Sequence, residues 1–265
     1  MFTVLGASGY VGSHLVAYLR SCGHEVWAPV KGDAAIFSRP LGHVFYCIGL
    51  TADFRTRPFD TVEAHISFLA DVLQRAKFDS LLYLSSTRVY MGATSTHEDA
   101  ALVVQPGNSS YLYNLSKLTG ESLCHAIGKP GVRVVRLSNV IGSDMDPMSG
   151  NFIASLLSEA QKGHIFLRSN LESAKDYIHI DDVVKGLLLI ALKGKFNTYN
   201  LASGENIKHK DWMGWVQKNI NCNFSVELNS PLHLFSKIEI ARLREELNFS
   251  ASNVIKHNKI SIKNN

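Results

Sequence analysis

The sequence predicts an α/β protein built on a doubly wound parallel sheet, followed by a smaller lobe. Short apolar runs alternate with helical periodicity over residues 1–140, which is typical of helices covering both faces of a parallel sheet. A glycine-rich turn, from Gly6 to Gly12, directly follows the first apolar run. With 265 residues, of which 46% are hydrophobic and 19% charged, the chain can bury a full core.

The first half contains apolar runs of strand length, separated by segments with helical periodicity. The expected strands are residues 2–5, 25–30, 43–48, 80–85 and 132–137. The expected helices are residues 12–22, 61–77 and 111–127. In the helix at 61–77 the helical period places five side chains on the inward face, namely Val62, Ile66, Leu69, Val72 and Leu73.

After Ser138 the alternation becomes less regular. Helices are still expected, at residues 151–162, 212–220 and 237–247. A further helix is expected to begin at an N-cap formed by Asp181 or Asp182.

The two parts lack a low-complexity linker and are expected to share one globule. We assign residues 1–140 to the first domain and 141–265 to the smaller, substrate-binding lobe. Residues 181–202 are expected to return to the first domain.

The composition excludes several classes of protein. A net charge of +4 without a clustered basic stripe argues against a nucleic-acid partner. The four cysteines form no Cys-x-x-Cys pair, which indicates a reducing, cytoplasmic compartment. No run reaches about 18 apolar residues, so we expect no membrane span. The eleven histidines lack the spacing of a helical zinc site, and no metal is expected.

A Gly-x-x-Gly-x-x-Gly turn lies between the first strand and the first helix. Glycine lets backbone N–H groups approach a pyrophosphate, and the helix start favours an anion. The commoner spacing is Gly-x-Gly-x-x-Gly, and a purely structural turn is the alternative. We predict a Rossmann-type dinucleotide site in this segment, formed by Gly6, Ser8, Gly9, Tyr10, Val11 and Gly12.

The residue expected to bind the adenosine ribose is not the usual acid. NAD-binding proteins place an Asp or Glu about 20 residues after the glycines. Here no acid lies between Trp27 and Gly32, and Lys31 stands near the end of the second strand. A lysine can pair with a 2′-phosphate, so the sequence favours NADP over NAD. The alternative is a lysine that only faces solvent.

Tyr113 and Lys117 are four residues apart on an expected helix, so their side chains share one face. A nearby ammonium favours the phenolate, and lowering a tyrosine pKa from about 10 to about 7 requires about 4 kcal/mol. Ser85 and Ser86 end the strand at 80–85, at the sheet edge where ligands bind. We predict that Ser85 contacts the cofactor and that Ser86 hydrogen-bonds the substrate oxygen. A chance Tyr-x-x-x-Lys and a serine turn are the alternatives.

These motifs resemble the extended short-chain dehydrogenase/reductases of the NAD-dependent epimerase/dehydratase group, which act mainly on nucleotide sugars. The resemblance runs from Thr3 to about Asn248. Besides the motifs above, it includes Arg-Leu-Ser-Asn-Val-Ile-Gly at 136–142, Lys-Asp-Tyr-Ile-His-Ile-Asp-Asp at 175–182 and Tyr-Asn-Leu-Ala-Ser-Gly at 199–204.

The resemblance implies roles for individual residues. Tyr113 would be the general acid/base, Lys117 would lower its pKa and hold the nicotinamide ribose, and Ser86 would polarise the substrate oxygen. Asn139 resembles the family's nucleotide-sugar-binding asparagine. Lys175 stands where the family often has an arginine on the substrate diphosphate, and it supplies charge without a bidentate fork.

The chain departs from the family around the predicted site. Only residues 31–42 separate the second strand from the third, so the adenine side of the pocket is shortened. Thr87 and Arg88 replace the acidic pair of the sugar 4,6-dehydratases, which disfavours dehydration. Arg55, Arg57 and Arg88 are interpreted either as a positive lip for a phosphate or sugar carboxylate, or as exposed arginines.

We therefore expect an NAD(P)-dependent epimerase or ketoreductase that acts on a nucleotide-activated sugar. A homodimer through the helices at 61–77 and 111–127 is implied by the family resemblance. Two alternatives stay open. One is a reductase of a small carbonyl compound, and the other is a non-catalytic dinucleotide-binding sensor, which the shortened adenine side favours.

Overall fold

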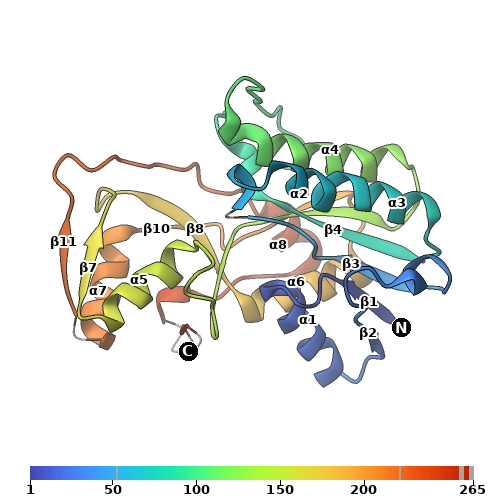
Figure 1. Cartoon of the computed structure of the whole chain (residues 1–265), viewed down its shortest axis with the longest axis horizontal. Helices are drawn as coiled ribbons and strands as arrows, with labels where there is room; N and C mark the ends of the chain where they lie inside the picture. Colours follow the sequence, from blue (N-terminus) through green and yellow to red (C-terminus); the bar gives the residue numbers. More distant parts are fainter. Residues whose placement is uncertain (52, 221, 257–259, 263–265) are drawn as a thin grey trace.

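The computed structural model describes residues 1–51, 53–220, 222–256 and 260–262, and it shows two lobes side by side (Figure 1). The larger lobe holds a six-stranded sheet whose neighbouring strands are all parallel. The strand order is β2 (Val26–Trp27), β1 (Phe2–Leu5), β3 (His43–Tyr46), β4 (Ser80–Ser86), β5 (Val132–Leu137) and β9 (Thr198–Leu201). The predicted doubly wound parallel sheet is confirmed.

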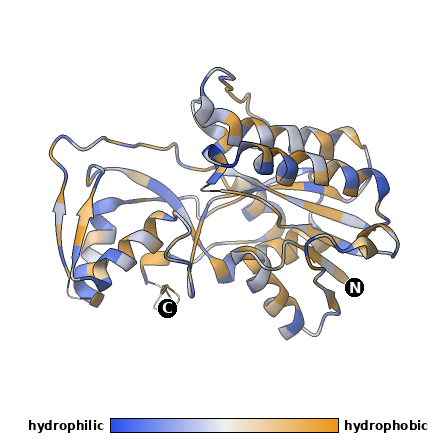
Figure 2. Ribbon diagram, in the orientation of Figure 1, coloured by the Kyte–Doolittle hydropathy of each residue, from blue (hydrophilic) through white to orange (hydrophobic). Residues whose placement is uncertain are grey.

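Helices cover both faces of this sheet, which is why its central strands are almost continuously apolar. One face is covered by α1 (Tyr10–Ser21), α6 (Ile180–Lys193) and α8 (Ala241–Leu247). The other is covered by α2 (Pro58–Val62), α3 (Phe68–Arg75) and α4 (Leu112–Ala126). Figure 2 shows the apolar residues concentrated in the strands and polar residues along the outer turns of the helices.

The predicted shortening after the second strand is also confirmed. Strand β2 pairs with β1 alone, and a single 3₁₀ turn, Ala34–Phe37, lies between β2 and β3. The strand expected at 25–30 is much shorter than predicted. Residues beyond Trp27 leave the sheet because this edge has no second neighbour among the described residues, and Val30 is 74% exposed.

The helix expected at 61–77 begins at Pro58, where proline suits a first helical turn, and a π-helical turn at Glu63–Ser67 interrupts it. The π turn adds a residue and so rotates the inward face. His65 is therefore completely buried, whereas Ile66, expected inward, is only half-buried.

The smaller lobe contains short strands that the sequence did not predict, because each is only a few residues long. They form two sheets, from β6 (Asn139–Ile141), β8 (Ala174–His179) and β10 (Asn206–Lys208), and from β7 (His164–Leu167) and β11 (Asn223–Val226). Helices α5 (Phe152–Gln161) and α7 (His209–Ile220) pack on them around Trp212. Segment 181–202 packs with the larger lobe, since α6 contacts α1 and β9 pairs with β5.

The starts of α6 and α8 differ from the sequence predictions for a visible reason. The N-cap of α6 is His179 rather than Asp181 or Asp182, because its buried ring nitrogen Nδ1 accepts the Asp181 N–H at 3.2 Å. The helix expected at 237–247 begins only at Ala241. The chain before it is held by Thr96, whose hydroxyl bonds the backbone of Lys237 and Glu239.

Candidate active site

The glycine turn connects β1 to α1 beside the end of β3. Gly6 has φ +85°, and a Cβ there would lie 2.9 Å from the Cys47 carbonyl carbon. A Cβ on Gly12 would lie 2.3 Å from the Gly6 oxygen. Gly9 is the N-cap of α1 and makes no side-chain capping bond, so the positive end of the helix faces outward. This cradle fits a dinucleotide pyrophosphate, and its role in binding one stays a prediction.

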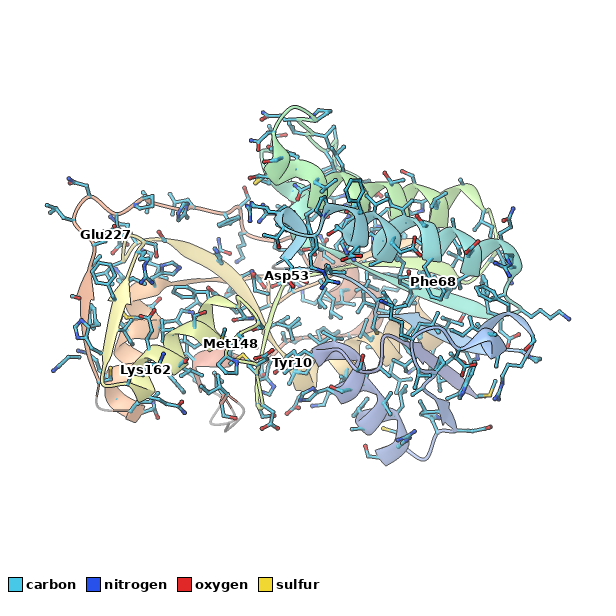
Figure 3. All side chains as sticks on the ribbon, in the orientation of Figure 1. Tyr10, Asp53, Phe68, Met148, Lys162 and Glu227 are labelled. Carbon is cyan, nitrogen blue, oxygen red and sulfur yellow. The ribbon has the colours of Figure 1, made fainter. Side chains whose placement is uncertain are left out.

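The other residues of this segment have different surroundings. Ser8 is exposed and Val11 is half-buried. Tyr10 donates a hydrogen bond from its hydroxyl to the Ser143 carbonyl at 3.0 Å, which links α1 to the smaller lobe. Figure 3 shows Tyr10 and Met148 close to the junction of the two lobes, with Asp53 above them. The glycine turn therefore lies where the lobes meet.

Tyr113 occupies the first turns of α4, next to the end of β4, and is 5% exposed. The side chains of Ser86 and Thr51 lie beside it. Burial raises the pKa of Tyr113, while the Ser86 bond, the Arg88 charge and the Thr51 bond partly oppose the increase. The structure thus brings Ser86 and Tyr113 together as predicted. Thr51 was missed, although it follows a strand that ends at the same sheet edge.

Lys117 lies one turn beyond Tyr113 and is also buried. Its ammonium donates to the Leu84 carbonyl at 2.8 Å and lies 5.0 Å from the Tyr83 ring centre. Burial lowers the pKa of Lys117 to about 7, against a smaller opposing effect of Glu121. The charge of Arg88 lowers the Tyr113 pKa in this structure, and the same role for Lys117 stays a prediction.

His65 completes the buried polar group and was missed by the sequence analysis. Its ring accepts the Leu50 N–H at 3.2 Å and bonds the Ser116 hydroxyl at 2.8 Å. It also stands edge-on to the Tyr113 ring, with the two planes at 85°. A lone histidine in an apolar helix carries no sequence signal for this role. The π turn alone brings it inward.

The adjacent residues Ser85 and Ser86 have different hydrogen-bond partners. The Ser85 hydroxyl donates to Glu121 at 2.5 Å, in the buried layer between the sheet and α4. That carboxylate also forms an ion pair with Arg136. The Ser86 hydroxyl accepts the Arg88 N–H at 3.2 Å and faces Tyr113. The side-chain oxygen of Ser85, predicted to contact the cofactor, is thus engaged with Glu121.

The three arginines of the predicted lip do not act as one group. Arg57 pairs with Asp60 at 2.8 Å and with Asp53 at 3.8 Å, so its charge is neutralised within its own turn. Arg55 and Arg88 instead both lie against Phe54, with guanidinium carbons 4.4 Å and 5.5 Å from the ring centre. Two of the three arginines therefore share one aromatic ring, and Arg88 also lies 5.9 Å from the centre of the Tyr113 ring.

The predicted substrate residues of the smaller lobe lie on neighbouring strands. Asn139 is exposed on β6, and its amide donates to the Asp176 carbonyl at 2.8 Å. Lys175 is half-buried on β8, with its ammonium 5.1 Å from the Phe235 ring centre. Burial lowers the pKa of Lys175, and the charge of Arg88 lowers it further. That Asn139 and Lys175 bind the substrate stays a prediction.

Lys31 lies apart from this group, in an exposed turn after β2. Among the residues that the structure describes, no three His, Cys, Asp or Glu side chains gather in a way that could hold a metal ion. Within the same residues, no helix is long and apolar enough to cross a membrane.

Comparisons with known proteins agree with this geometry. A model of the NAD dependent epimerase/dehydratase family matches residues 2–202. The chain is 25% identical to the dTDP-4-dehydro-6-deoxy-D-allose reductase of Streptomyces bikiniensis, over 77% of this chain and 76% of that protein. It is 29% identical to the GDP-6-deoxy-D-mannose reductase of Pseudomonas aeruginosa, over 78% of this chain and 76% of that protein.

Solved structures show the same fold. MoeE5, in complex with UDP-glucuronic acid and NAD, superposes with a TM-score of 0.79, covering 95% of this chain and 94% of that chain at 20% identity. At 20% identity, this similarity shows a shared fold only.

Proposed function

This chain belongs to the NAD dependent epimerase/dehydratase family, and we propose from that premise that it reduces or epimerises a nucleotide-activated sugar. The observation that carries the proposal is the buried Tyr113 side chain at the carboxyl edge of the sheet, with the Ser86 and Thr51 side chains placed to lower its pKa. A protein that only bound a dinucleotide would need no such group.

In this proposal Tyr113 exchanges a proton with the reacting oxygen of the sugar, and Ser86 orients that oxygen. NAD(P), when bound, supplies the hydride acceptor or donor. The glycine turn would hold its pyrophosphate, and Tyr113, Lys117 and the Ser85 backbone would hold its nicotinamide end. Asn139 and Lys175 would bind the nucleotide part of the substrate from the smaller lobe.

Ketone reduction is the direction that the site favours. Burial raises the Tyr113 pKa, so the phenol is protonated at neutral pH and can donate to a carbonyl oxygen. Two relatives are named as reductases of nucleotide-linked sugars, which supports the same direction. A 4-epimerase is the second candidate, since it would use the same tyrosine in both directions. The contribution of Lys175 from β8 argues against a small carbonyl compound as the substrate.

The proposal is tested by replacing Tyr113 with Phe. Turnover is measured as NADPH consumption with dTDP- and GDP-linked 4-dehydro-6-deoxyhexoses, and cofactor binding is measured by titration. We expect Tyr113→Phe to lower kcat by about 10²–10⁴-fold while NADPH affinity stays within about threefold. Tyr111→Phe, in the preceding 3₁₀ turn, is the matched control. Retained turnover in Tyr113→Phe would overturn the assignment.

A homodimer is also part of the proposal. Helices α2, α3 and α4 lie together on one side of the molecule (Figure 1), and Phe59 on α2 is 87% exposed. The family resemblance implies a subunit contact through this layer, and Phe59 is available there to test it. We expect light scattering to give the dimer mass for the wild type and the monomer mass for Phe59→Glu.

A further inference from the structure

Arg88 lies over the Tyr113 ring, Arg55 shares the Phe54 ring with it, and Lys175 faces them from the smaller lobe. The Arg88 guanidinium carbon lies 5.9 Å from the centre of the Tyr113 ring. Arg55 reaches the same area from the loop after β3, and its Nη2 lies 3.4 Å from the Ser110 hydroxyl. Lys175 approaches from β8, close enough for the charge of Arg88 to lower its pKa.

The protein provides no counter-ion for these cations. In the described part of the chain, no ion pair joins Arg55, Arg88 or Lys175 to a carboxylate. Arg57 in the same loop is different, because it forms ion pairs with Asp53 and Asp60. Arg88 is half-buried, whereas Arg55 beside it is exposed. A half-buried cation close to a like charge is unfavourable unless an anion joins it, and a ligand can supply that anion.

Arg88 is oriented by residues that also position the tyrosine. Its Nε donates to the Asn114 side-chain oxygen at 3.2 Å, and the Asn114 amide returns a bond to the Arg88 carbonyl at 3.1 Å. Asn114 is completely buried and directly follows Tyr113 on α4. The guanidinium is therefore fixed relative to the hydroxyl that exchanges the proton.

We propose that Arg88, assisted by Arg55, binds a carboxylate carried by the sugar ring itself, so that the substrate is a nucleotide-activated sugar acid. Because Arg88 lies beside the reacting hydroxyl, its anion belongs to the reacting sugar. Lys175, on the smaller lobe, would bind the diphosphate at the other end of the substrate. A guanidinium forms a bidentate pair with a carboxylate, which makes arginine suited to distinguishing an acidic sugar from a neutral one. The inference rests on the proposed function.

The experiment compares Kd values for acidic and neutral partners with the same base, in the presence of NAD⁺. The pairs are UDP-glucuronic acid with UDP-glucose, and GDP-mannuronic acid with GDP-mannose. For the pair that binds, we expect the acid to bind at least about tenfold more tightly to the wild type. Arg88→Gln should lose this preference while affinity for the neutral sugar stays within about twofold.

Control variants separate the site from general effects of charge. Arg57→Gln removes a charge of the same loop and should leave both Kd values unchanged. Arg88→Lys should keep part of the preference, because it retains the charge without the fork. The melting temperature in the absence of ligand shows whether each variant is folded. If Arg88→Gln is unfolded, Arg55→Gln provides a second test, and we expect it to weaken binding of the acid only.

The outcomes distinguish this inference from the proposed function. If the wild type binds acidic and neutral sugars equally, or if Arg88→Gln weakens both equally, the sugar-acid inference is wrong and the nucleotide-sugar assignment stands. If no member of either pair binds, the sugar-acid inference is wrong, and the nucleotide-sugar assignment fails with it only if the dTDP- and GDP-linked 4-dehydro-6-deoxyhexoses are not turned over either.

Discussion

Arg136 on β5 donates three hydrogen bonds to the carboxylate of Glu121 on α4, at 2.7–3.2 Å, and both side chains are almost completely buried. The same carboxylate accepts the Ser85 hydroxyl from β4. Glu121 thereby ties α4 to two strands one turn beyond Lys117. The helix that carries Tyr113 and Lys117 is held in position by an ion pair under the site.

Replacing Glu121 should destabilise the protein strongly. Glu121→Gln leaves the Arg136 charge buried without its partner, and we expect a loss of about 3–5 kcal/mol in the free energy of unfolding. Urea unfolding measures the change. Glu245→Gln, the same substitution at an exposed position of α8, is the control and should stay within about 0.5 kcal/mol. A loss below about 1 kcal/mol for Glu121→Gln would show that the pair does not hold α4.

The two adjacent serines should separate catalysis from stability. Ser86→Ala removes a hydroxyl from Tyr113, and we expect kcat to fall by about 10²-fold with little change in unfolding. Ser85→Ala removes a hydrogen bond to the buried Glu121, and we expect a loss of about 1–3 kcal/mol in stability with kcat within about threefold. Steady-state kinetics and urea unfolding of both variants test this, and a reversed pattern would contradict the assignment.

His65 should make the protein sensitive to acid. Burial, assisted by the Lys117 charge, lowers the pKa of His65 to about 2, whereas the ring titrates near 6.5 in an unfolded chain. Between these values the unfolded chain binds a proton that the folded protein does not. Stability from His65 is therefore complete above about pH 6.5 and falls by about 1.4 kcal/mol per pH unit below it.

The measurement is the pH dependence of urea unfolding for the wild type and His65→Gln. Between pH 7 and pH 5, the free energy of unfolding of His65→Gln should depend less steeply on pH, by the equivalent of up to one proton bound on unfolding. His209 should still contribute, since burial lowers its pKa to about 4. An unchanged slope in His65→Gln would mean that this ring is protonated in the folded protein.

Lys31 should set the preference between the two dinucleotides. It lies in an exposed turn after β2, where a 2′-phosphate would meet its ammonium. We expect Lys31→Glu to weaken NADPH binding by at least about tenfold while NADH affinity stays within about threefold. Lys162→Glu, at the end of α5 in the smaller lobe, is the control. If the wild type binds NADH more tightly than NADPH, the role of Lys31 is wrong.

The sequence analysis succeeded where the chemistry depends on local spacing. The Gly6 to Gly12 turn, the strand end at Ser86 and the Tyr113–Lys117 pair each depend on neighbours a few residues away. It failed for His65, because a single added residue in a π turn reverses which side chain faces inward. It also missed the short strands of the smaller lobe, whose pairing depends on partners far along the chain.

The sequence by itself determined the alternation of strands and helices, the glycine cradle and the shortened segment after β2, since periodicity and turn residues act locally. Only the tertiary structure decided which charges are paired. Arg57 is neutralised within its own turn, whereas Arg88 and Arg55 share the Phe54 ring and, among the described residues, pair with no carboxylate. Charge pairing depends on distances between elements that fold together, and no spacing along the chain encodes those distances.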